Sequence, residues 1–171
     1  MMRIRKTVET DLAQIGEIYA NAKRFMAATG NPHQWNDERP NIATAREDME
    51  KGIGYVVEEE GKILAVFMFS QALDPTYATI YGGKWLSDAP YGVIHRIAVA
   101  KQGQGIIGYC INECFAHCGN LRIDTHRDNV IMHHILRKYG FIYCGVIYLA
   151  NGEARDAYQL TIKSKNNRKN I

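Results

Sequence analysis

Three closely spaced glycines lie where a predicted strand meets a predicted helix, and this arrangement suits the binding of a phosphate group. Val93 to Val99 is β-branched and apolar, which predicts a strand. Gly103, Gly105 and Gly108 follow it. Apolar side chains then recur at helical spacing from Ile106 to Cys118. The first N–H groups of a helix are unpaired, its dipole adds positive charge, and glycine lets a diphosphate approach the backbone. We therefore expect a phosphate-bearing cofactor at this turn.

The same glycines also resemble a dinucleotide-binding fingerprint. Residues 103–108 read G-x-G-x-x-G, and Asp124 ends the next predicted strand 19 residues after Gly105. Three residues separate the strand from the first glycine, whereas the fingerprint turn follows its strand directly. Only 63 residues follow the last glycine, and they end in an antiparallel hairpin. About 90 residues of mixed helix and strand precede the turn, although the fingerprint normally opens its domain. A dinucleotide-binding protein is therefore the less favoured interpretation.

The remaining periodicity predicts helices and strands that can position this turn. Strand, helix and strand between residues 93 and 124 form a βαβ unit, whose two strands should be parallel. Asn151-Gly152 indicates a hairpin, so the last two strands should be antiparallel. Predicted helices cover residues 10–30, 42–51, 106–118 and 129–140. Predicted strands begin at Ile4 and cover 54–59, 62–70, 93–99, 121–124, 141–150 and 157–162.

The length and charge of the chain indicate one globular domain with a short basic tail. The chain has 171 residues, enough for one domain with a substantial core, which we place at residues 1–162. The net charge of +3 is misleading, because residues 163–171 carry four basic residues and no acids. We expect this tail to be disordered and not to bind nucleic acid.

Other patterns bear on location and on metal binding. No window approaches 18 uninterrupted apolar residues and no apolar stretch follows the N-terminus, so we expect no membrane span, no signal peptide and a cytoplasmic protein. Cys110, Cys114 and Cys118 lie four apart on the apolar stripe of the predicted central helix. Packed free thiols in a reducing compartment explain this spacing better than a metal site, so we expect no metal.

Taken together, these motifs resemble the GNAT superfamily of acetyl-coenzyme A-dependent N-acetyltransferases over nearly all of the chain. Gln102 to Ile107 resembles the family motif Gln/Arg-x-x-Gly-x-Gly/Ala, which follows a strand ending in Val. Asp124-Thr125-His126 with Asn129, and a helix ending in Lys138-Tyr139-Gly140-Phe141, resemble its second signature. The resemblance implies an α/β (α+β) fold with a mixed, mostly antiparallel, twisted sheet. Such a sheet has six to seven strands, one parallel βαβ pair and flanking helices.

Two positions depart from the family pattern. Ile107 stands where Gly or Ala is usual, and Gly108 one place later can allow a slight shift of the first helical turn. Leu136 stands where many GNAT enzymes have the Tyr that protonates the leaving thiolate. These departures leave open a non-catalytic module that binds acyl-coenzyme A for regulation, although we favour an acyltransferase.

The resemblance also implies roles for the residues of the turn and the strand before it. The backbones of Ile97 and Val99 would pair with the pantetheine arm, and the N–H of Ile97 would donate to the oxyanion. The turn would hold the diphosphate, and Asn129 would hold the far part of the arm or simply cap its helix. The expected cofactor-binding residues are Ile97, Ala98, Val99, Gln102, Gly103, Gln104, Gly105, Ile106, Ile107, Gly108 and Asn129.

Acetyl transfer to an amine needs a group that accepts a proton, because an alkyl ammonium has a pKa of about 10.4. His95 lies two residues before Ile97, and histidine titrates in the useful range. Asp124 ends the neighbouring strand, and His126 lies two residues further on. A helix cap or a buried hydrogen bond would also explain Asp124 or His126, and direct attack by a positioned amine remains an alternative. Candidate acids are Tyr139, Tyr143 and Tyr158.

The acceptor should bind near two irregular segments, residues 31–40 and 77–92. Trp35, Tyr77, Tyr81 and Trp85 lie in these segments and could line an acceptor pocket or simply cover the sheet. We expect a small-molecule or peptide amine as the acceptor. The last two strands should leave an exposed sheet edge, so we also expect a homodimer.

Overall fold

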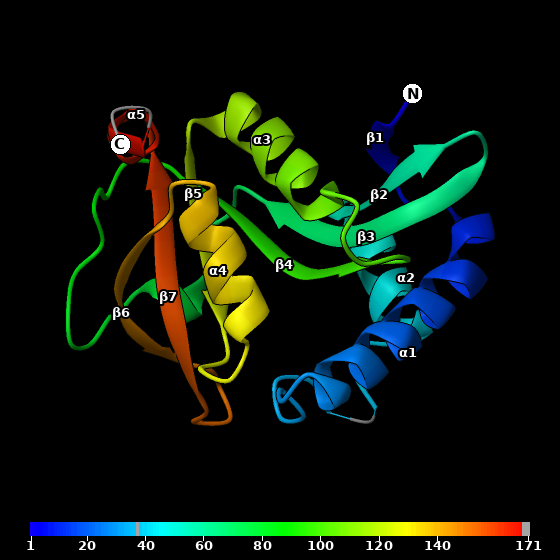
Figure 1. Cartoon of the computed structure of the whole chain (residues 1–171), viewed down its shortest axis with the longest axis horizontal. Coiled ribbons are helices and arrows are strands. Elements are labelled where there is room, and N and C mark those ends of the chain that lie inside the picture. Colours follow the sequence, from blue (N-terminus) through cyan, green and yellow to red (C-terminus); the bar gives the residue numbers. More distant parts are fainter. Residues whose placement is uncertain (37, 169–171) are drawn as a thin grey trace. The chain divides into compact units, whose positions relative to one another are not determined.

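The computed structural model describes residues 1–36 and 38–168, and its helices and strands can be followed along the chain in Figure 1. The N-terminal elements are β1 (Arg3–Lys6), α1 (Leu12–Ala28), α2 (Ile42–Glu50), β2 (Gly54–Glu59) and β3 (Lys62–Ser70). After them come β4 (Gly92–Val99), α3 (Ile106–Cys118), β5 (Asn120–Thr125), α4 (Val130–Lys138), β6 (Ile142–Tyr148), β7 (Ala154–Thr161) and α5 (Ile162–Asn167).

The strands of the described residues form a seven-stranded sheet in the order β1-β2-β3-β4-β5-β7-β6. β4 and β5 are parallel, with Gly92 opposite Leu121 and Val93 opposite Arg122. The sheet is otherwise mostly antiparallel, and helices flank it, which confirms the predicted fold class. The antiparallel pairs β5–β7 and β6–β7 differ from the mostly parallel sheet of a dinucleotide-binding fold, so that interpretation is not supported.

Contacts divide the described chain into two units, and both β4 and α3 run from one unit into the other. Unit 1 comprises residues 1–69 and 94–110, and unit 2 comprises residues 70–93 and 111–171. The expectation of a single domain over residues 1–162 stays a prediction. No described helix has the length and apolar character needed to cross a membrane.

Unit 1 has its core where α1 and α2 pack against strands. The apolar face of α1 recurs at helical spacing, and Ile15 and Tyr19 are almost fully buried. α2 begins at a reciprocal cap, in which the Thr44 N–H donates to the Asn41 side chain (3.1 Å) and the Asn41 N–H donates to Thr44 Oγ1 (3.1 Å). The core residues are Leu12, Ile15, Ile18, Tyr19, Ala22, Ala45, Val56, Ile63, Val66 and Ala98.

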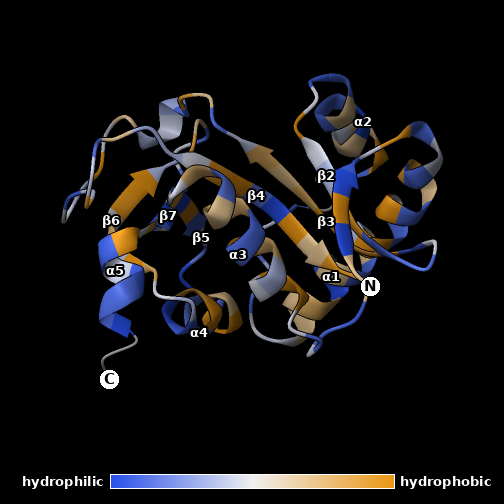
Figure 2. Ribbon diagram, turned by 90° about the horizontal axis from the view of Figure 1, so that it is seen from above, coloured by the Kyte–Doolittle hydropathy of each residue, from blue (hydrophilic) through white to orange (hydrophobic). Residues whose placement is uncertain are grey.

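β4 is an apolar strand with a polar interruption. Figure 2 shows its hydrophobic ends separated by a hydrophilic stretch, which corresponds to His95-Arg96. Arg96 has a φ of +52°, in the left-handed region that side chains other than Gly rarely adopt. A strand is therefore present as predicted, but residue 96 is not extended. Simple alternation along a strand would place His95 and Ile97 on one face, but this requires residue 96 to be extended.

Unit 2 is built on a β6–β7 hairpin, with β7 between β6 and β5. Tyr158 of β7 is opposite Ile123 of β5 and Tyr143 of β6. α4 lies across these strands in Figure 1, and His133 of α4 contacts the Tyr158 hydroxyl (2.7 Å). The smaller core cluster of this unit contains Tyr77, Tyr91, Val93, Ile147 and Ala157.

Side chains of β5 and β7 hold the segment of residues 75–91, which precedes β4. Gln159 is fully buried; its Oε1 accepts from the Leu86 N–H (2.7 Å), and its Nε2 donates to Ser87 O (3.1 Å). The Asn120 side chain donates to Ala89 O (3.2 Å), and Arg122 donates to Ser87 O (2.8 Å). This segment is therefore fixed to the sheet by hydrogen bonds to its backbone.

Gln159→Leu is expected to destabilise the protein. The substitution keeps roughly the same volume but leaves backbone groups of the 75–91 segment without their partner, at a cost of about 1–3 kcal/mol. The free energy of unfolding from urea denaturation measures this effect. Gln71→Leu is the control, because Gln71 is exposed in the loop after β3 and its change should stay within about 0.5 kcal/mol. Equal stability of the two variants would contradict the role given to Gln159.

The basic tail differs from the expectation of disorder. Residues 162–167 form α5, which begins where the Ser164 N–H donates to Thr161 Oγ1 (3.2 Å) and the Thr161 N–H donates to Ser164 Oγ (2.9 Å). This reciprocal cap and the absence of Gly or Pro between residues 162 and 167 explain the helix. Residues 169–171 of the predicted tail lie outside the described residues.

β6 stands at the end of the strand order, as expected for an exposed edge. Part of that edge is already paired, because Tyr81 and Val146 exchange two backbone hydrogen bonds (2.9 and 2.8 Å). Ile142, Tyr143 and Tyr148 of β6 are about half exposed. The homodimer stays a prediction.

Candidate active site

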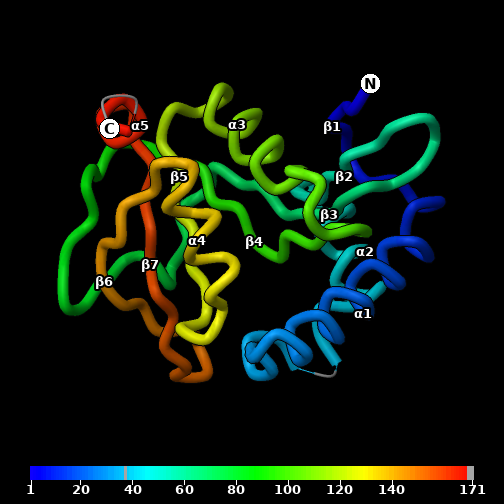
Figure 3. The backbone as a smooth tube through the Cα atoms, in the orientation of Figure 1, coloured from blue at the N-terminus to red at the C-terminus, as the bar shows by residue number. Residues whose placement is uncertain are grey.

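The turn between β4 and α3 can be followed in Figure 3 as a tight reversal of the chain. Gly103 and Gly105 have φ values of +76° and +70°, and a Cβ built on either would meet no atom within 4 Å. Gly105 O accepts the first helical hydrogen bond from the Tyr109 N–H (3.1 Å). Residues 101–105 are exposed. The turn therefore combines left-handed glycines, open space beside them and the N-terminus of a 13-residue helix.

The other residues expected to bind the cofactor have different surroundings. Ile106 and Gly108 are buried, and Ile107 is half-buried at the start of α3. Gln102 and Gln104 are exposed. These exposures suit a site made by the backbone and polar side chains of the turn, with the side chain of Ile106 in the core.

The strand before the turn carries the predicted oxyanion donor. Ile97 is half-buried, and Ala98 and Val99 are buried. The Ala100 N–H donates to Leu64 O of β3 (2.8 Å), which holds the end of β4. His95 lies on the same strand and is half-buried, and only Arg96 separates it from Ile97.

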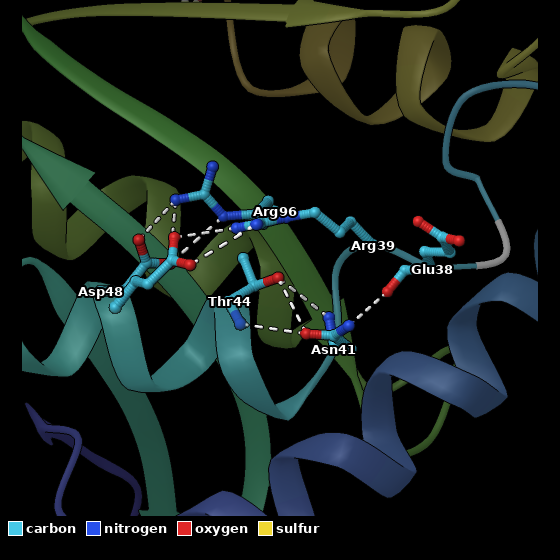
Figure 4. A network of polar contacts seen from close by, with 7 residues as sticks. Glu38, Arg39, Asn41, Thr44, Asp48 and Arg96 are labelled. Carbon is cyan, nitrogen blue, oxygen red and sulfur yellow. Dashed lines mark hydrogen bonds and ion pairs between the residues drawn. The ribbon is translucent and has the colours of Figure 1, made fainter.

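Arg96 was not among the sequence candidates, yet it has the most constrained environment on β4. Figure 4 shows its guanidinium beside the carboxylate of Asp48 on α2. Arg96 Nη2 lies 2.7 Å from Asp48 Oδ1, and Arg96 Nε lies 3.2 Å from Asp48 Oδ2. Asp48 is buried. No sequence signal connects two residues that lie 48 positions apart.

In unit 2, Asp124 accepts a hydrogen bond from the hydroxyl of Tyr77 (2.7 Å). Tyr77 is fully buried, and burial together with the charge of Asp124 raises the pKa of its hydroxyl well above the usual value. The hydroxyl therefore stays protonated and donates. This hydrogen bond fixes the orientation of the Asp124 carboxylate.

His126 and Asn129 follow β5 in a local hydrogen-bonded turn. The Asp128 N–H donates to His126 Nδ1 (3.1 Å), and burial together with the nearby charge of Arg155 lowers the pKa of His126. His126 is therefore neutral at pH 7. The Met132 N–H donates to Asn129 Oδ1 (3.1 Å), so Asn129 caps α4. A role of Asn129 toward the cofactor stays a prediction.

The four aromatic residues expected near the acceptor fall into three settings. Trp35 lies in unit 1 with its ring edge-on to Tyr19 (5.8 Å between centroids). Tyr77 and Trp85 lie together in unit 2, where Trp85 Nε1 donates to Tyr77 O (3.0 Å). Tyr81 is about half exposed and packs against Tyr148. Tyr77 belongs to the core, so its side chain covers the sheet, whereas Tyr81 remains accessible.

Among the candidate acids, Tyr158 is buried, Tyr139 is half-buried and Tyr143 is about half exposed. Leu136 is fully buried, so the position where many relatives carry Tyr is apolar here. The Tyr158 hydroxyl is hydrogen-bonded to His133 Nδ1 (2.7 Å). Cys110 and Cys114 of α3 are buried free thiols, and burial raises the pKa of Cys114 to about 12.

Taken unit by unit, these groups can perform three tasks of acyl transfer. The turn after β4 can bind a phosphate, the backbone of β4 can donate to a developing oxyanion, and Asp124 can attract a cation. Sequence patterns identified the turn and Asp124. They missed Arg96, Asp48 and the hydrogen bond from Tyr77, which depend on contacts between distant parts of the chain.

Comparisons with known proteins test this interpretation. No protein-family model matches the chain, and no curated protein matches it. Two solved structures with lower identity share the fold. A GNAT-family acetyltransferase from Listeria monocytogenes is 18% identical, with a TM-score of 0.67 over 93% of this chain and 94% of that chain. A proposed acetyltransferase from Salmonella typhimurium, solved with its cofactor acetyl-CoA, is 20% identical, with a TM-score of 0.55 over 94% of each chain.

A third structure matches with higher identity. It is a GNAT-family acetyltransferase from Streptococcus agalactiae, 33% identical, with a TM-score of 0.85 over 94% of this chain and 95% of that chain. This identity extends over nearly the full length of both proteins. The sheet order and the glycine turn of this chain also match what the family resemblance implied. The chain therefore belongs to the GNAT family of acetyltransferases.

Proposed function

We propose that this protein transfers the acetyl group of acetyl-CoA to a primary amine of a small molecule or peptide. The glycine turn after β4 is the observation that carries the cofactor assignment. Its left-handed glycines leave open space where a Cβ would stand, and they lie at the N-terminus of α3, where helices leave their first N–H groups without a partner inside the helix. A diphosphate fits such a cradle. The Salmonella protein solved with acetyl-CoA supports the same class of ligand.

We assign the binding of coenzyme A to backbone and polar groups of this chain. The turn holds the diphosphate, and the end of β4 pairs with the pantetheine arm. Asn129 holds the far part of the arm while it caps α4. The assigned residues are Ile97, Ala98, Val99, Gln102, Gly103, Gln104, Gly105, Ile106, Ile107, Gly108 and Asn129.

Bound acetyl-CoA supplies an acetyl thioester, and three groups of the chain act on the reaction. The N–H of Ile97 donates to the carbonyl oxygen as it gains charge. Asp124 attracts the ammonium form of the acceptor, and His95 takes a proton from the amine. The neutral amine nitrogen then bonds to the carbonyl carbon, the second proton on that nitrogen passes to water, and the bond from the carbon to sulfur breaks.

A dedicated acid for the leaving sulfur is not required. Leu136 is buried and has no proton to give. A thiol such as cysteine has a pKa of about 8.5, so a thiolate is a stable leaving group near neutral pH. We therefore propose that the sulfur leaves as the thiolate and takes its proton from water.

Titration calorimetry with acetyl-CoA and with NAD tests the cofactor assignment, and acetyl-CoA is the expected ligand. A panel of small amines and peptides, assayed for release of free coenzyme A, tests transfer. Tight binding of NAD without binding of acetyl-CoA would overturn the proposal. Binding of acetyl-CoA without turnover of any amine would favour the non-catalytic module.

A further inference from the structure

Arg96 has a backbone conformation that its residue type disfavours. Its φ is +52°, and among the described residues Glu60 is the other non-glycine with a positive φ. Glu60 precedes Gly61 in the tight turn between β2 and β3, where such a conformation is common. Arg96 instead lies inside a strand. A left-handed L-residue in a strand persists only when its surroundings hold it there.

The side chain of Arg96 provides such a hold. Its guanidinium binds both oxygens of Asp48, with Nη2 at 2.7 and 2.9 Å and Nε at 3.2 Å. This two-pronged geometry fixes orientation as well as distance. The carboxylate is itself fixed, because Asp48 is buried on α2 and the cap between Asn41 and Thr44 sets the start of that helix (Figure 4).

We propose that Arg96 is a positioning residue: its ion pair with Asp48 holds the left-handed conformation that aims the N–H of Ile97. The φ and ψ angles of residue 96 set the direction of the next peptide N–H. This inference rests on the proposed function, in which Ile97 donates to the oxyanion. It adds that the Ile97 N–H is oriented through an ion pair with Asp48 of α2, which takes no direct part in the reaction.

A second ion pair on α2 provides a matched comparison. Arg39 Nη2 lies 2.9 Å from Glu47 Oε2, but both side chains are about half exposed. Glu47 and Asp48 are neighbours on one helix, and Arg39 belongs to the segment before α2 and not to β4. Exposed pairs of this kind contribute little to stability. Neutralising Glu47 therefore changes the charge of α2 without releasing Arg96.

The experiment compares Arg96→Ala, Arg96→Gly, Asp48→Asn and Glu47→Gln. Arg96→Ala should lower kcat about 10- to 100-fold, because alanine at this position relaxes toward an extended strand and moves the donor. Arg96→Gly should stay within about fivefold of the unmodified protein, because glycine adopts a positive φ at no steric cost. Asp48→Asn should lower kcat about tenfold by weakening the contact. Glu47→Gln should be unchanged.

Two readouts separate positioning from a merely structural role. The KM for acetyl-CoA should change less than about threefold in all four variants, since the diphosphate site is intact. The ¹H–¹⁵N resonance of the Ile97 amide should move in Arg96→Ala and return toward its original position in Arg96→Gly. Asp48→Asn should move it in the same direction, so the test stands even where Arg96→Ala folds poorly.

The outcomes distinguish this inference from the proposed function. An Ile97 resonance that does not move in Arg96→Ala or Asp48→Asn would overturn the inference, whatever the activity. A loss of kcat in Arg96→Gly equal to that in Arg96→Ala would also overturn it, because the guanidinium itself would then be required. If the unmodified protein acetylates no amine, the proposed function fails, while the resonance still tests the positioning of the peptide.

Discussion

Gly105→Val is expected to reduce acetyl-CoA affinity by at least about 100-fold, because it affects the phosphate turn in two ways. Gly105 has a φ of +70°, which a β-branched residue adopts only with strain. The Cβ position is open in the structure, so the branched side chain would occupy the space assigned to the diphosphate. Titration calorimetry with acetyl-CoA measures the loss.

Gly61→Val is the control for Gly105→Val. Gly61 also has a positive φ, +77°, and open space at its Cβ position, but it lies in the turn between β2 and β3. It should lose stability without losing acetyl-CoA affinity. Normal affinity of a folded Gly105→Val protein would refute the assignment of the phosphate to this turn.

His95→Ala is expected to lower kcat by about 10²–10⁴-fold, the usual share of a general base. Histidine is the side chain type that most often accepts a proton in acid–base catalysis, and the alanine that replaces it has no group to accept one. Acetyl-CoA affinity should change little. Steady-state kinetics over a range of pH values, with the best amine from the panel, measures both effects.

Asp124→Asn separates a cation-binding role from the role of base. Asparagine keeps the shape and can still accept the hydrogen bond from Tyr77, but it has no charge. It should raise the KM for the amine more than it lowers kcat. Glu113→Gln is the control, since Glu113 is exposed on α3. Unchanged kcat in His95→Ala with a large loss in Asp124→Asn would transfer the role of base to Asp124.

Local sequence patterns predicted most of the elements correctly because each element carries its own periodicity or cap. The glycine turn, the helix cap at Asn129 and the hairpin at Asn151-Gly152 are all signals within a few residues. The insertion of β7 between β5 and β6 is not local. Pairing of a hairpin with an earlier strand depends on which of its two strands meets that partner, and alternation alone does not decide this.

The candidate site likewise combines residues that a local motif reveals with residues that only contacts between distant parts of the chain reveal. The residues of the phosphate turn follow each other in the chain, so their motif is visible. The residue type of Arg96 does not predict a positive φ, because Gly and Asn are the residues that usually adopt one. Tyr77 looked like a wall of the acceptor pocket because its loop is irregular. Its burial depends on Asp124, which lies 47 positions later.

The segment of residues 75–91 has a consequence for how ligands exchange. Gln159, Asn120 and Arg122 bind its backbone, so its conformational entropy is lost when the protein folds and not when a ligand arrives. A ligand that binds beside this segment therefore meets a preformed surface. Selection among ligands then depends on how well each one fits that surface, and not on a movement that closes the segment over it. We therefore expect turnover without a slow closing movement of this segment.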